Sequence, residues 1–523
     1  MVKTKEPPPR KEKRTLVVVE AGAQADAATP RDSRPPSSSL VGGVLHALHA
    51  WVRIVAPGAA RVVLPWLREG ARVRWVDDRP PDPFIRLSAP VLDQRHRSFL
   101  NEELQSLLEG GMIREIPRVG AVCSNPARVE AKRDSEKLRL VVNYRGPVNN
   151  SAVKKGIRLE TLSVLPTVLK KGDWLVTLDL RSGYHHFRFH PSVQPYLGFN
   201  ILDRFFEPVA LNFGFTLSPY IFHKIVRQVV RHLRQQHRVK MLSYLDDFLI
   251  MAPSHDEALK ARDTVLEVFG SLGLQVAENK GQWEPVQELE FLGVCVVTNP
   301  LRFKAPHSKV VRVASQAQRL LDTAGHQDGL VSVKALQQCL GLMAFLDRAL
   351  RPCKLHTREL FNVASRGCYP RRERSIKGWP KGTTRLTPQA EEDLRWWAHL
   401  TESDWVLAGR PIAPPCLMHA VRVFTDAAGE VGWGGTDARG TVIARGNWGP
   451  TEHREHITLK EMRAVLLTLM ALDEEIAHRR VLVLCDNMAV VRVLSKGSSR
   501  SPELMQLLRE IFKWAVGRGI QVY

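Results

Sequence analysis

The fold of this chain is decided by residues 241–251, which read Met-Leu-Ser-Tyr-Leu-Asp-Asp-Phe-Leu-Ile-Met. Two apolar runs flank the adjacent carboxylates Asp246 and Asp247, a pattern typical of two buried strands that meet at a tight turn. No Lys or Arg lies within the stretch, although a buried carboxylate must be paired or must bind a metal ion. Such an oxygen-rich site suits a magnesium ion that is bound together with substrate phosphates. The alternative is an ordinary Asp-Asp turn at a protein surface.

A third carboxylate, Asp179, ends the β-rich run of residues 174–178, and Ser182-Gly183 marks the break that follows. Two strands that each end in carboxylates build one site for two metal ions, which clamp the attacking and leaving oxygens of a phosphoryl transfer. These segments resemble the palm of a reverse transcriptase: residues 244–247 resemble its motif C, and the Asp179 segment resembles its motif A. The resemblance implies an α+β and α/β multidomain fold, a right-hand polymerase with fingers, palm and thumb, followed by a ribonuclease H-like α/β domain.

The implied metal ligands of the palm are Asp179, Asp246 and Asp247 together with the main-chain carbonyl of Leu180. In this family they hold two Mg²⁺ ions per active site, for which Mn²⁺ substitutes. The implied partners are an RNA template, a DNA primer and deoxynucleoside triphosphates. The expected activity is that of an RNA-directed DNA polymerase, a nucleotidyltransferase.

A basic hairpin is predicted from residues 127–132 and 138–145, two β-like runs joined by a charged turn. Lys132 and Arg139 sit at the spacing of the fingers residues that bind the incoming triphosphate in this family. Cations stabilise charge on a transferring phosphoryl group, so the role suits their chemistry. The alternative is a basic hairpin without a ligand.

The resemblance assigns further roles along the palm. Tyr184 is implied to stack under the sugar and to exclude a 2′-hydroxyl, with simple packing as the alternative. Phe213 and Gly214 lie in a segment that resembles motif B, where glycine lets the backbone approach the nucleotide closely. Lys280 lies in a segment that resembles motif D and is implied to donate a proton to the leaving pyrophosphate. Residues 291–293 resemble the motif E turn that grips the primer.

A helix is predicted over residues 221–236, with four cations on one side. They are Lys224, Arg227, Arg231 and Arg234. Two interpretations stay open for this face: exposure to solvent, or contact with the template strand.

A second carboxylate set follows in the C-terminal part. Asp426 ends a predicted strand, Glu461 lies on a predicted helix over residues 458–472, and Asp486 ends another predicted strand. Singly, each acid is more often a cap or turn residue. Together they resemble ribonuclease H, whose acidic residues hold two metal ions that activate water against the RNA of an RNA–DNA hybrid. The chain stops at Tyr523 inside a late strand, so this domain is expected to be incomplete.

The domain organisation follows from these segments and from shifts in composition. Helices are predicted to start at Ser332 and at Thr387, and residues 339–345 resemble DIRS-type retrotransposon polymerases in particular. The expected parts are a disordered basic, Pro-rich tail (1–42), a poorly defined segment (43–89) with ordered structure starting near Pro90, fingers and palm (90–304), thumb and connection helices (305–415) and the truncated ribonuclease H-like domain (416–523).

Composition supports a nucleic-acid partner. The chain has 75 basic and 54 acidic residues, a net charge of +21, and neutralised phosphates release counterions. The alternative is that the surplus of basic residues only increases solubility. The seven cysteines show neither a Cys-x-x-Cys pair nor zinc-finger spacing, which indicates no disulfide framework or zinc site. With no membrane-spanning apolar run and no signal peptide, the expected location is intracellular, in the cytoplasm, the nucleus or both.

Two rival functions remain at this stage. A non-catalytic nucleic-acid-binding relic of a retroelement would keep the charge but lose carboxylates, and the three palm carboxylates survive. A cellular or intron-type reverse transcriptase is disfavoured by the ribonuclease H-like segment.

Overall fold

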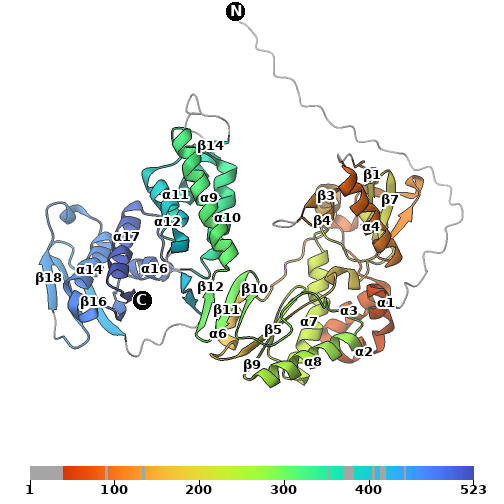
Figure 1. Cartoon of the computed structure of the whole chain (residues 1–523), viewed down its shortest axis with the longest axis horizontal. Coiled ribbons are helices and arrows are strands. Elements are labelled where there is room, and N and C mark those ends of the chain that lie inside the picture. Colours follow the sequence, from red (N-terminus) through yellow and green to blue (C-terminus); the bar gives the residue numbers. More distant parts are fainter. Residues whose placement is uncertain are drawn as a thin grey trace, which may run out of the picture. The chain divides into compact units, whose positions relative to one another are not determined.

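The computed structural model describes residues 39–88, 92–131, 136–350, 353–368, 382–402, 407–412, 420–440 and 443–523. The chain divides into two units (Figure 1). The first unit comprises Met1–Leu169 and Asp173–Val286, and the second comprises Lys170–Gly172 and Gln287–Tyr523. Most of the tail predicted over residues 1–42 lies outside the described residues.

The centre of the first unit is a three-stranded antiparallel sheet of β5 (Trp174–Asp179), β9 (Asp247–Ala252) and β8 (Met241–Tyr244), in that order. The predicted hairpin is therefore confirmed. Helices α7 (Ser218–Gln236) and α8 (His255–Ser271) pack on the sheet (Figure 1). Val176, Leu178 and Phe248 are fully buried, because β-branched and large apolar residues fit a covered sheet.

Three helices that precede the fingers complete the core of this palm. They are α1 (Leu40–His46), α2 (Leu48–Ile54) and α3 (Pro57–Glu69). Trp51 is fully buried, and its indole N–H donates to the carbonyl of Leu272 over 2.9 Å. The backbones of Gly43 and Gly273 are so close that a Cβ on Gly273 would lie 2.2 Å from the carbonyl carbon of Gly43.

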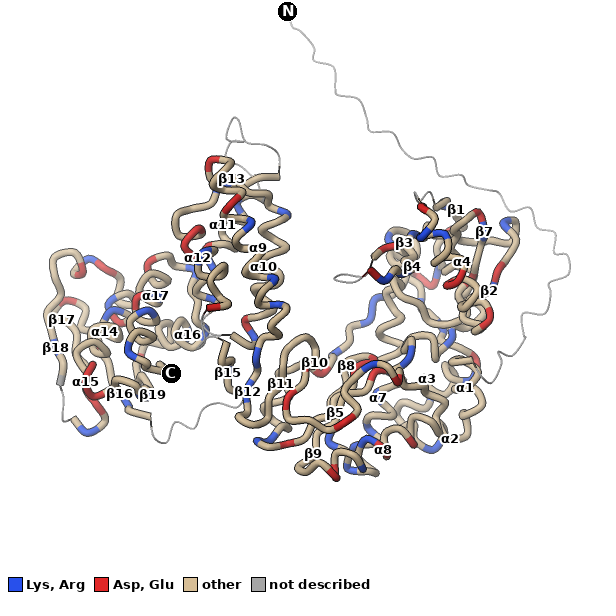
Figure 2. Tube along the Cα trace, in the orientation of Figure 1, with Lys and Arg blue, Asp and Glu red and all other residues tan. Residues whose placement is uncertain are grey.

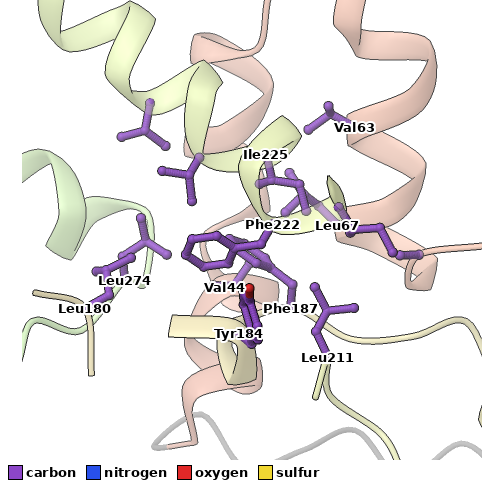
Figure 3. Close-up of a cluster of buried hydrophobic side chains, with 14 of the residues drawn as sticks. Val44, Val63, Leu67, Leu180, Tyr184, Phe187, Leu211, Phe222, Ile225 and Leu274 are labelled. Atoms are coloured by element: carbon purple, nitrogen blue, oxygen red, sulfur yellow. The ribbon is translucent and has the colours of Figure 1, made fainter. Parts of the chain in front are cut away.

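The expectation that ordered structure starts near Pro90 is therefore wrong. Figure 3 shows Val44, Val63 and Leu67 of these helices in one cluster with Phe222 of α7 and Tyr184. The helices were missed because the partners of their apolar residues lie more than a hundred positions away along the chain.

The fingers are built from a mixed sheet and the helix α4 (Gln94–Glu109), which Asp93 caps by accepting the N–H of His96. The strand order is β1-β3-β6-β7-β2, and β4 pairs with β3. The strands are β1 (Phe84–Ile85), β2 (Ile113–Ile116), β3 (Cys123–Ala131), β4 (Leu138–Val142), β6 (Phe199–Ile201) and β7 (Arg204–Pro208).

The predicted basic hairpin is β3 and β4, in antiparallel register from Ala127 opposite Val142 to Ala131 opposite Leu138. It carries charges of both signs (Figure 2). The remaining elements of the first unit are short: η1 (Val76–Asp78), η2 (Arg118–Gly120), α5 (Pro147–Ser151), η3 (Leu162–Val164), α6 (Leu165–Val168), η4 (Gly183–His186) and η5 (Gln194–Leu197).

The second unit begins with a sheet of β10 (Glu288–Phe291), β11 (Val294–Thr298), β12 (Leu301–Lys304) and β15 (Arg410–Pro411). The turn at Leu292-Gly293 joins the first two strands, and both residues have positive φ. The next helices in this unit are α9 (His307–His326), α10 (Val333–Leu346), α11 (Arg358–Cys368) and α12 (Pro388–Ala398) (Figure 1), and β13 (Leu330–Ser332) pairs with β14 (Thr383–Arg385). Ser332 and Thr387 cap α10 and α12, as predicted.

A five-stranded mixed sheet ends the chain, in the order β18-β17-β16-β19-β20. Strand β16 (Val421–Ala427) pairs antiparallel with β17 (Gly432–Asp437) and parallel with β19 (Arg480–Leu484). The helix α14 (Ile457–Ala471) packs on β16 and β17. The other elements are β18 (Ile443–Asn447), η7 (Glu452–Arg454), α15 (Asp473–Ile476), α16 (Met488–Lys496), α17 (Pro502–Gly517) and β20 (Gln521–Val522); η6 (Leu400–Glu402) precedes the sheet.

The ion pair of Asp393 and Arg509 joins α12 to α17. Asp393 is fully buried and accepts two hydrogen bonds from Arg509, at 2.6 and 2.9 Å. Cys123, Cys295, Cys339, Cys353 and Cys485 are free thiols. No helix among the described residues is both long and apolar enough to cross a membrane.

Candidate functional site

The three palm carboxylates meet at one end of the central sheet. Asp179 is the last residue of β5 and lies opposite Asp247, the first residue of β9. Asp246 precedes Asp247 in the turn, and the N–H of Leu180 donates to the carbonyl of Asp246 over 3.2 Å. The antiparallel register thus brings together residues that are 68 positions apart in the chain, from 179 to 247.

A glycine makes room for this arrangement. A Cβ on Gly183 would lie 3.0 Å from the Cβ of Asp246 and 3.2 Å from the ring of Phe222. The turn itself is strained, since Leu245 has a φ of 56°, a region that non-glycine residues seldom adopt. Strain of this kind persists only where the surrounding structure holds it.

The carboxylates repel one another where they lie. Burial, and then the charge of Asp179, raises the pKa of Asp246. Burial, and then the charges of Asp246 and Asp179, raises the pKa of Asp247 to about 6. The Nζ of Lys280 lies 3.3 Å from Oδ2 of Asp179, whereas Oδ1 of Asp179 is buried without a hydrogen-bond partner. A buried, unsatisfied carboxylate oxygen beside two further carboxylates fits a divalent cation.

A cleft of about 550 Å³ extends from Asp246 to the fingers hairpin. Its lining includes the predicted site residues Leu180, Asp246, Lys280, Arg139, Phe213 and Gly214. Arg139 also pairs with Glu130 at 3.2 Å. The predicted Lys132 lies outside the described residues. The structure therefore brings most of the predicted nucleotide-binding residues to one cleft.

Tyr184 lies just beneath this cleft. Its ring is buried against Phe222, with centroids 5.2 Å apart, and against Phe213, with centroids 4.7 Å apart. Burial, and then the charge of Asp246, raises the pKa of Tyr184 to about 12. Phe213 is 61% exposed and lines the cleft above the tyrosine. Packing thus explains the buried ring, and its role toward the nucleotide stays a prediction.

Two of the four cations on the basic side of α7 bind groups of the palm instead of facing solvent, and contact of this side with a template strand stays a prediction. Arg231 donates to the carbonyl of Ile54 over 2.9 Å, and Arg234 donates to both carboxylate oxygens of Glu160 at 2.7 and 2.6 Å. These two partly buried cations link α7 to Ile54 and to Glu160. Arg227 is exposed.

Sequence reasoning missed two groups at this site. Glu160 accepts the N–H of Ser243 over 3.0 Å and so anchors β8. His185 lines the cleft, and burial lowers its pKa to about 4; its Nδ1 has no hydrogen-bond partner. The paired histidines beside Tyr184 were a signal for the second group, whereas Glu160 gave none.

A second acidic cluster lies in the C-terminal sheet. Phe424 and Leu484 are paired in the parallel register of β16 and β19, and Asp426 and Asp486 each follow two residues later. Glu461 on α14 is only 5% exposed. Burial, and then the charges of Asp426 and Asp486, raises its pKa to about 7. The structure thus brings the three predicted acids together.

Cys485 belongs to this cluster and was not predicted. Its Sγ lies 3.8 Å from Oε2 of Glu461. One ligand atom each from Glu461, Cys485 and Asp486 lie within 4.8 Å of one another. Cysteine spacing along the chain gave no hint, because Glu461 comes from another element.

Comparison with known proteins identifies the part of the chain around the palm. Residues 135–296 match the family model described as reverse transcriptase (RNA-dependent DNA polymerase). The enzymatic polyprotein of soybean chlorotic mottle virus is 26% identical over 249 residues, 47% of this chain and 33% of that protein. The retrovirus-related Pol polyprotein from transposon opus of Drosophila melanogaster is 24% identical over 291 residues, 55% of this chain and 27% of that protein. The chain thus spans no more than about a third of these relatives.

Solved structures support the fold. The foamy viral protease-reverse transcriptase in complex with an RNA/DNA hybrid has a TM-score of 0.52 and 15% identity, with 92% of this chain and 62% of that chain covered. The same kind of protein in complex with double-stranded DNA, described as dRH, has a TM-score of 0.52 and 15% identity, with 92% and 81% covered. The mixed α/β polymerase architecture is therefore as predicted. Residues 135–296 form a reverse transcriptase domain, and the chain is a homologue of retroelement Pol polyproteins.

Proposed function

We propose that this chain is the RNA-directed DNA polymerase of a retrotransposon. The observation that carries the proposal is the placement of Asp179 opposite Asp247, with Asp246 beside them at the end of a cleft that reaches Arg139. A cleft with acids at one end and a cation at the other suits a nucleoside triphosphate bound with metal ions. The +21 net charge suits the proposed template and primer strands.

The donor set fits two Mg²⁺ ions, or Mn²⁺ in their place. Asp179, Asp246, Asp247 and the carbonyl of Leu180 would hold them. Bound there, the metal ions would lower the pKa of the primer 3′-hydroxyl and neutralise the triphosphate. The buried oxygen of Asp179 that lacks a partner supports this assignment.

The chain's own residues perform the remaining tasks. Arg139, with Lys132, neutralises the triphosphate, and base pairing with the template selects the nucleotide. Tyr184, held by Phe222, excludes a ribose 2′-hydroxyl. Lys280 contacts Asp179 and, in this proposal, moves to the leaving pyrophosphate to donate a proton.

Primer extension on an RNA template tests this function. Asp246→Asn removes one carboxylate charge, and we expect the rate of nucleotide incorporation to fall about 10²- to 10³-fold. Asp203→Asn is a matched control, because Asp203 is exposed in the β6–β7 turn and its φ of 58° suits asparagine. Equal incorporation by Asp246→Asn and the control would contradict this mechanism, whereas no incorporation by wild type would support a non-catalytic relic.

We further propose a ribonuclease H activity in the second unit. Its support is the cluster of Asp426, Glu461 and Asp486 on a five-stranded mixed sheet. Three acids of this kind hold metal ions that activate water against a phosphodiester. The test is cleavage of the RNA strand of an RNA–DNA hybrid in Mg²⁺: Asp486→Asn should abolish it and leave primer extension intact. Cleavage that survives this substitution would contradict the assignment.

The DIRS-type assignment is a narrower proposal that rests on residues 339–345. The genomic sequence downstream tests it: a tyrosine recombinase reading frame would support it, and a retroviral-type integrase would overturn it.

A further inference from the structure

Cys485 introduces a soft ligand into a site otherwise made of oxygens. It follows the last residue of β19 and precedes Asp486, and its thiol faces Glu461 of α14. We infer that Glu461, Cys485 and Asp486 form a binding site for a thiophilic divalent cation of the Zn²⁺ or Cd²⁺ type. The inference shares two acids with the proposed nuclease site, but it requires no nuclease activity.

The distances between ligand atoms suit a single ion. In tetrahedral coordination, a thiolate at about 2.3 Å and a carboxylate oxygen at about 2.1 Å lie roughly 3.6 Å apart. Sγ of Cys485 and Oε2 of Glu461 are 3.8 Å apart, and an Asp486 oxygen completes a set within 4.8 Å. The three groups therefore need only small side-chain adjustments, and a water molecule would fill the fourth position.

The surroundings of the site favour a cation. Only 5% of Glu461 is exposed. Among the described residues, no Lys or Arg forms a salt bridge with it. A carboxylate buried in this way is stabilised by a metal ion.

A second observation comes from Thr425, which precedes Asp426 on β16. It is only 6% exposed, and its buried Oγ1 has no hydrogen-bond partner apart from a weak interaction with the thiol of Cys485. Thr425 lines a cleft of about 810 Å³ together with Asp426, Cys485 and Asp486. A water molecule on the bound ion would give this hydroxyl a stronger partner than the thiol.

Ligand chemistry predicts the selectivity. Thiolate ligands favour zinc-type ions, whereas carboxylates and carbonyls suit Mg²⁺. The ion binds Cys485 as a thiolate and releases the thiol proton to solvent. The palm site offers only oxygens from Asp179, Asp246 and Asp247, so micromolar Zn²⁺ or Cd²⁺ should occupy the Cys485 site in millimolar Mg²⁺ without displacing Mg²⁺ from the palm.

A Cd²⁺ titration of the full chain in the presence of Mg²⁺, at one fixed pH, tests the inference. Thiolate-to-cadmium charge-transfer absorption reports sulfur coordination directly. In the wild type, this absorption should contain a component that saturates with Cd²⁺, and the component should be missing in Cys485→Ser and in Cys485→Ala. Glu461→Gln should retain a sulfur signal but need at least about tenfold more Cd²⁺, which corresponds to 1.4 kcal/mol.

Controls make the test specific. Cys339→Ala removes a thiol that is buried on α10 and should leave the titration unchanged. Thermal unfolding and primer extension of Cys485→Ser should match wild type, which shows that the variant is folded. Superimposable titrations of wild type and Cys485→Ser would overturn the inference.

The two proposals at this site fail separately. A chain that binds Cd²⁺ through Cys485 but cleaves no RNA would overturn the nuclease proposal alone. A chain that cleaves RNA and shows no Cys485-dependent signal would overturn the thiophilic site alone.

Discussion

Asp179 and Asp247 lie directly opposite each other in the register of β5 and β9. The sheet therefore forces two carboxylates together, with Asp246 as a third neighbour, and leaves one oxygen of Asp179 buried without a partner. Such a concentration of negative charge destabilises the metal-free fold, and a bound cation relieves it.

The contribution of Asp247 to the stability of the metal-free protein should therefore fall with rising pH. The pKa of Asp247 is raised from 3.8 to about 6, so between these values the folded state keeps a proton that the unfolded chain has lost. Linkage then lowers the free energy of unfolding as pH rises through this window. Because Asp247 is partly exposed, we expect Asp247→Asn to raise the free energy of unfolding at pH 7 by only about 1–2 kcal/mol.

Calorimetric unfolding at pH 4 and pH 7, with and without Mg²⁺, measures this effect. The gain in Asp247→Asn should disappear at pH 4 and should shrink in Mg²⁺. A gain of the same size under all conditions, or the same gain in the control Asp203→Asn, would contradict the electrostatic explanation.

Gly183 should be intolerant of a side chain. In Gly183→Ala, the new Cβ would press on Asp246 and on the ring of Phe222, at 3.0 and 3.2 Å, so Asp246 must shift. We expect kcat/KM for nucleotide incorporation to fall at least about tenfold, because small displacements of catalytic groups are costly. Gly156→Ala is the control, since its Cβ would meet nothing within 4 Å, and it should retain full activity.

Trp51 should be a major contributor to the stability of the palm. It is fully buried and bonded to Leu272, so Trp51→Ala should lower the free energy of unfolding by about 3–5 kcal/mol. Val52, the next residue of α2, is 55% exposed, and Val52→Ala should change stability by no more than about 0.5 kcal/mol. Equal stabilities of the two variants in chemical denaturation would show that α2 does not support the palm.

Two arginines of α7 should contribute unequally to the stability of the palm. Arg234→Ala breaks a bidentate pair with Glu160 and should lower the free energy of unfolding by about 1–2 kcal/mol. Loss of a fully buried pair would lower it more, but both of these partners are partly exposed. Arg227→Ala should leave the unfolding temperature unchanged. The opposite ranking in thermal unfolding would contradict the stabilising role of the Arg234–Glu160 pair.

The carboxylate cluster of the palm was the most predictable part of the structure. Strand periodicity placed Asp246 and Asp247 at a turn and Asp179 at a strand end, and the antiparallel register then brought them together. Local capping chemistry also placed the starts of α10 and α12 at Ser332 and Thr387. The strand ends, the turn and the helix caps depend on residues close together in the chain, whereas the pairing of β5 with β9 joins Asp179 and Asp247, which are 68 positions apart.

Features that depend on distant partners could not be predicted. Trp51 is buried because it meets the end of α8, more than two hundred residues later. Arg231 and Arg234 look like surface cations until their acceptors, Ile54 and Glu160, are known. Cys485 reads as a strand residue, and only the packing of α14 on the sheet brings Glu461 to it.

The central claim is that Asp179 and Asp246 act as one site, and a double-mutant comparison tests it most directly. Single-turnover nucleotide incorporation in Mg²⁺ is measured for Asp179→Asn, Asp246→Asn and the double variant. Residues that act as a unit are strongly non-additive, so the double variant should lose no more activity than the more impaired single variant. Losses that multiply, or near-normal activity of Asp179→Asn, would contradict the account.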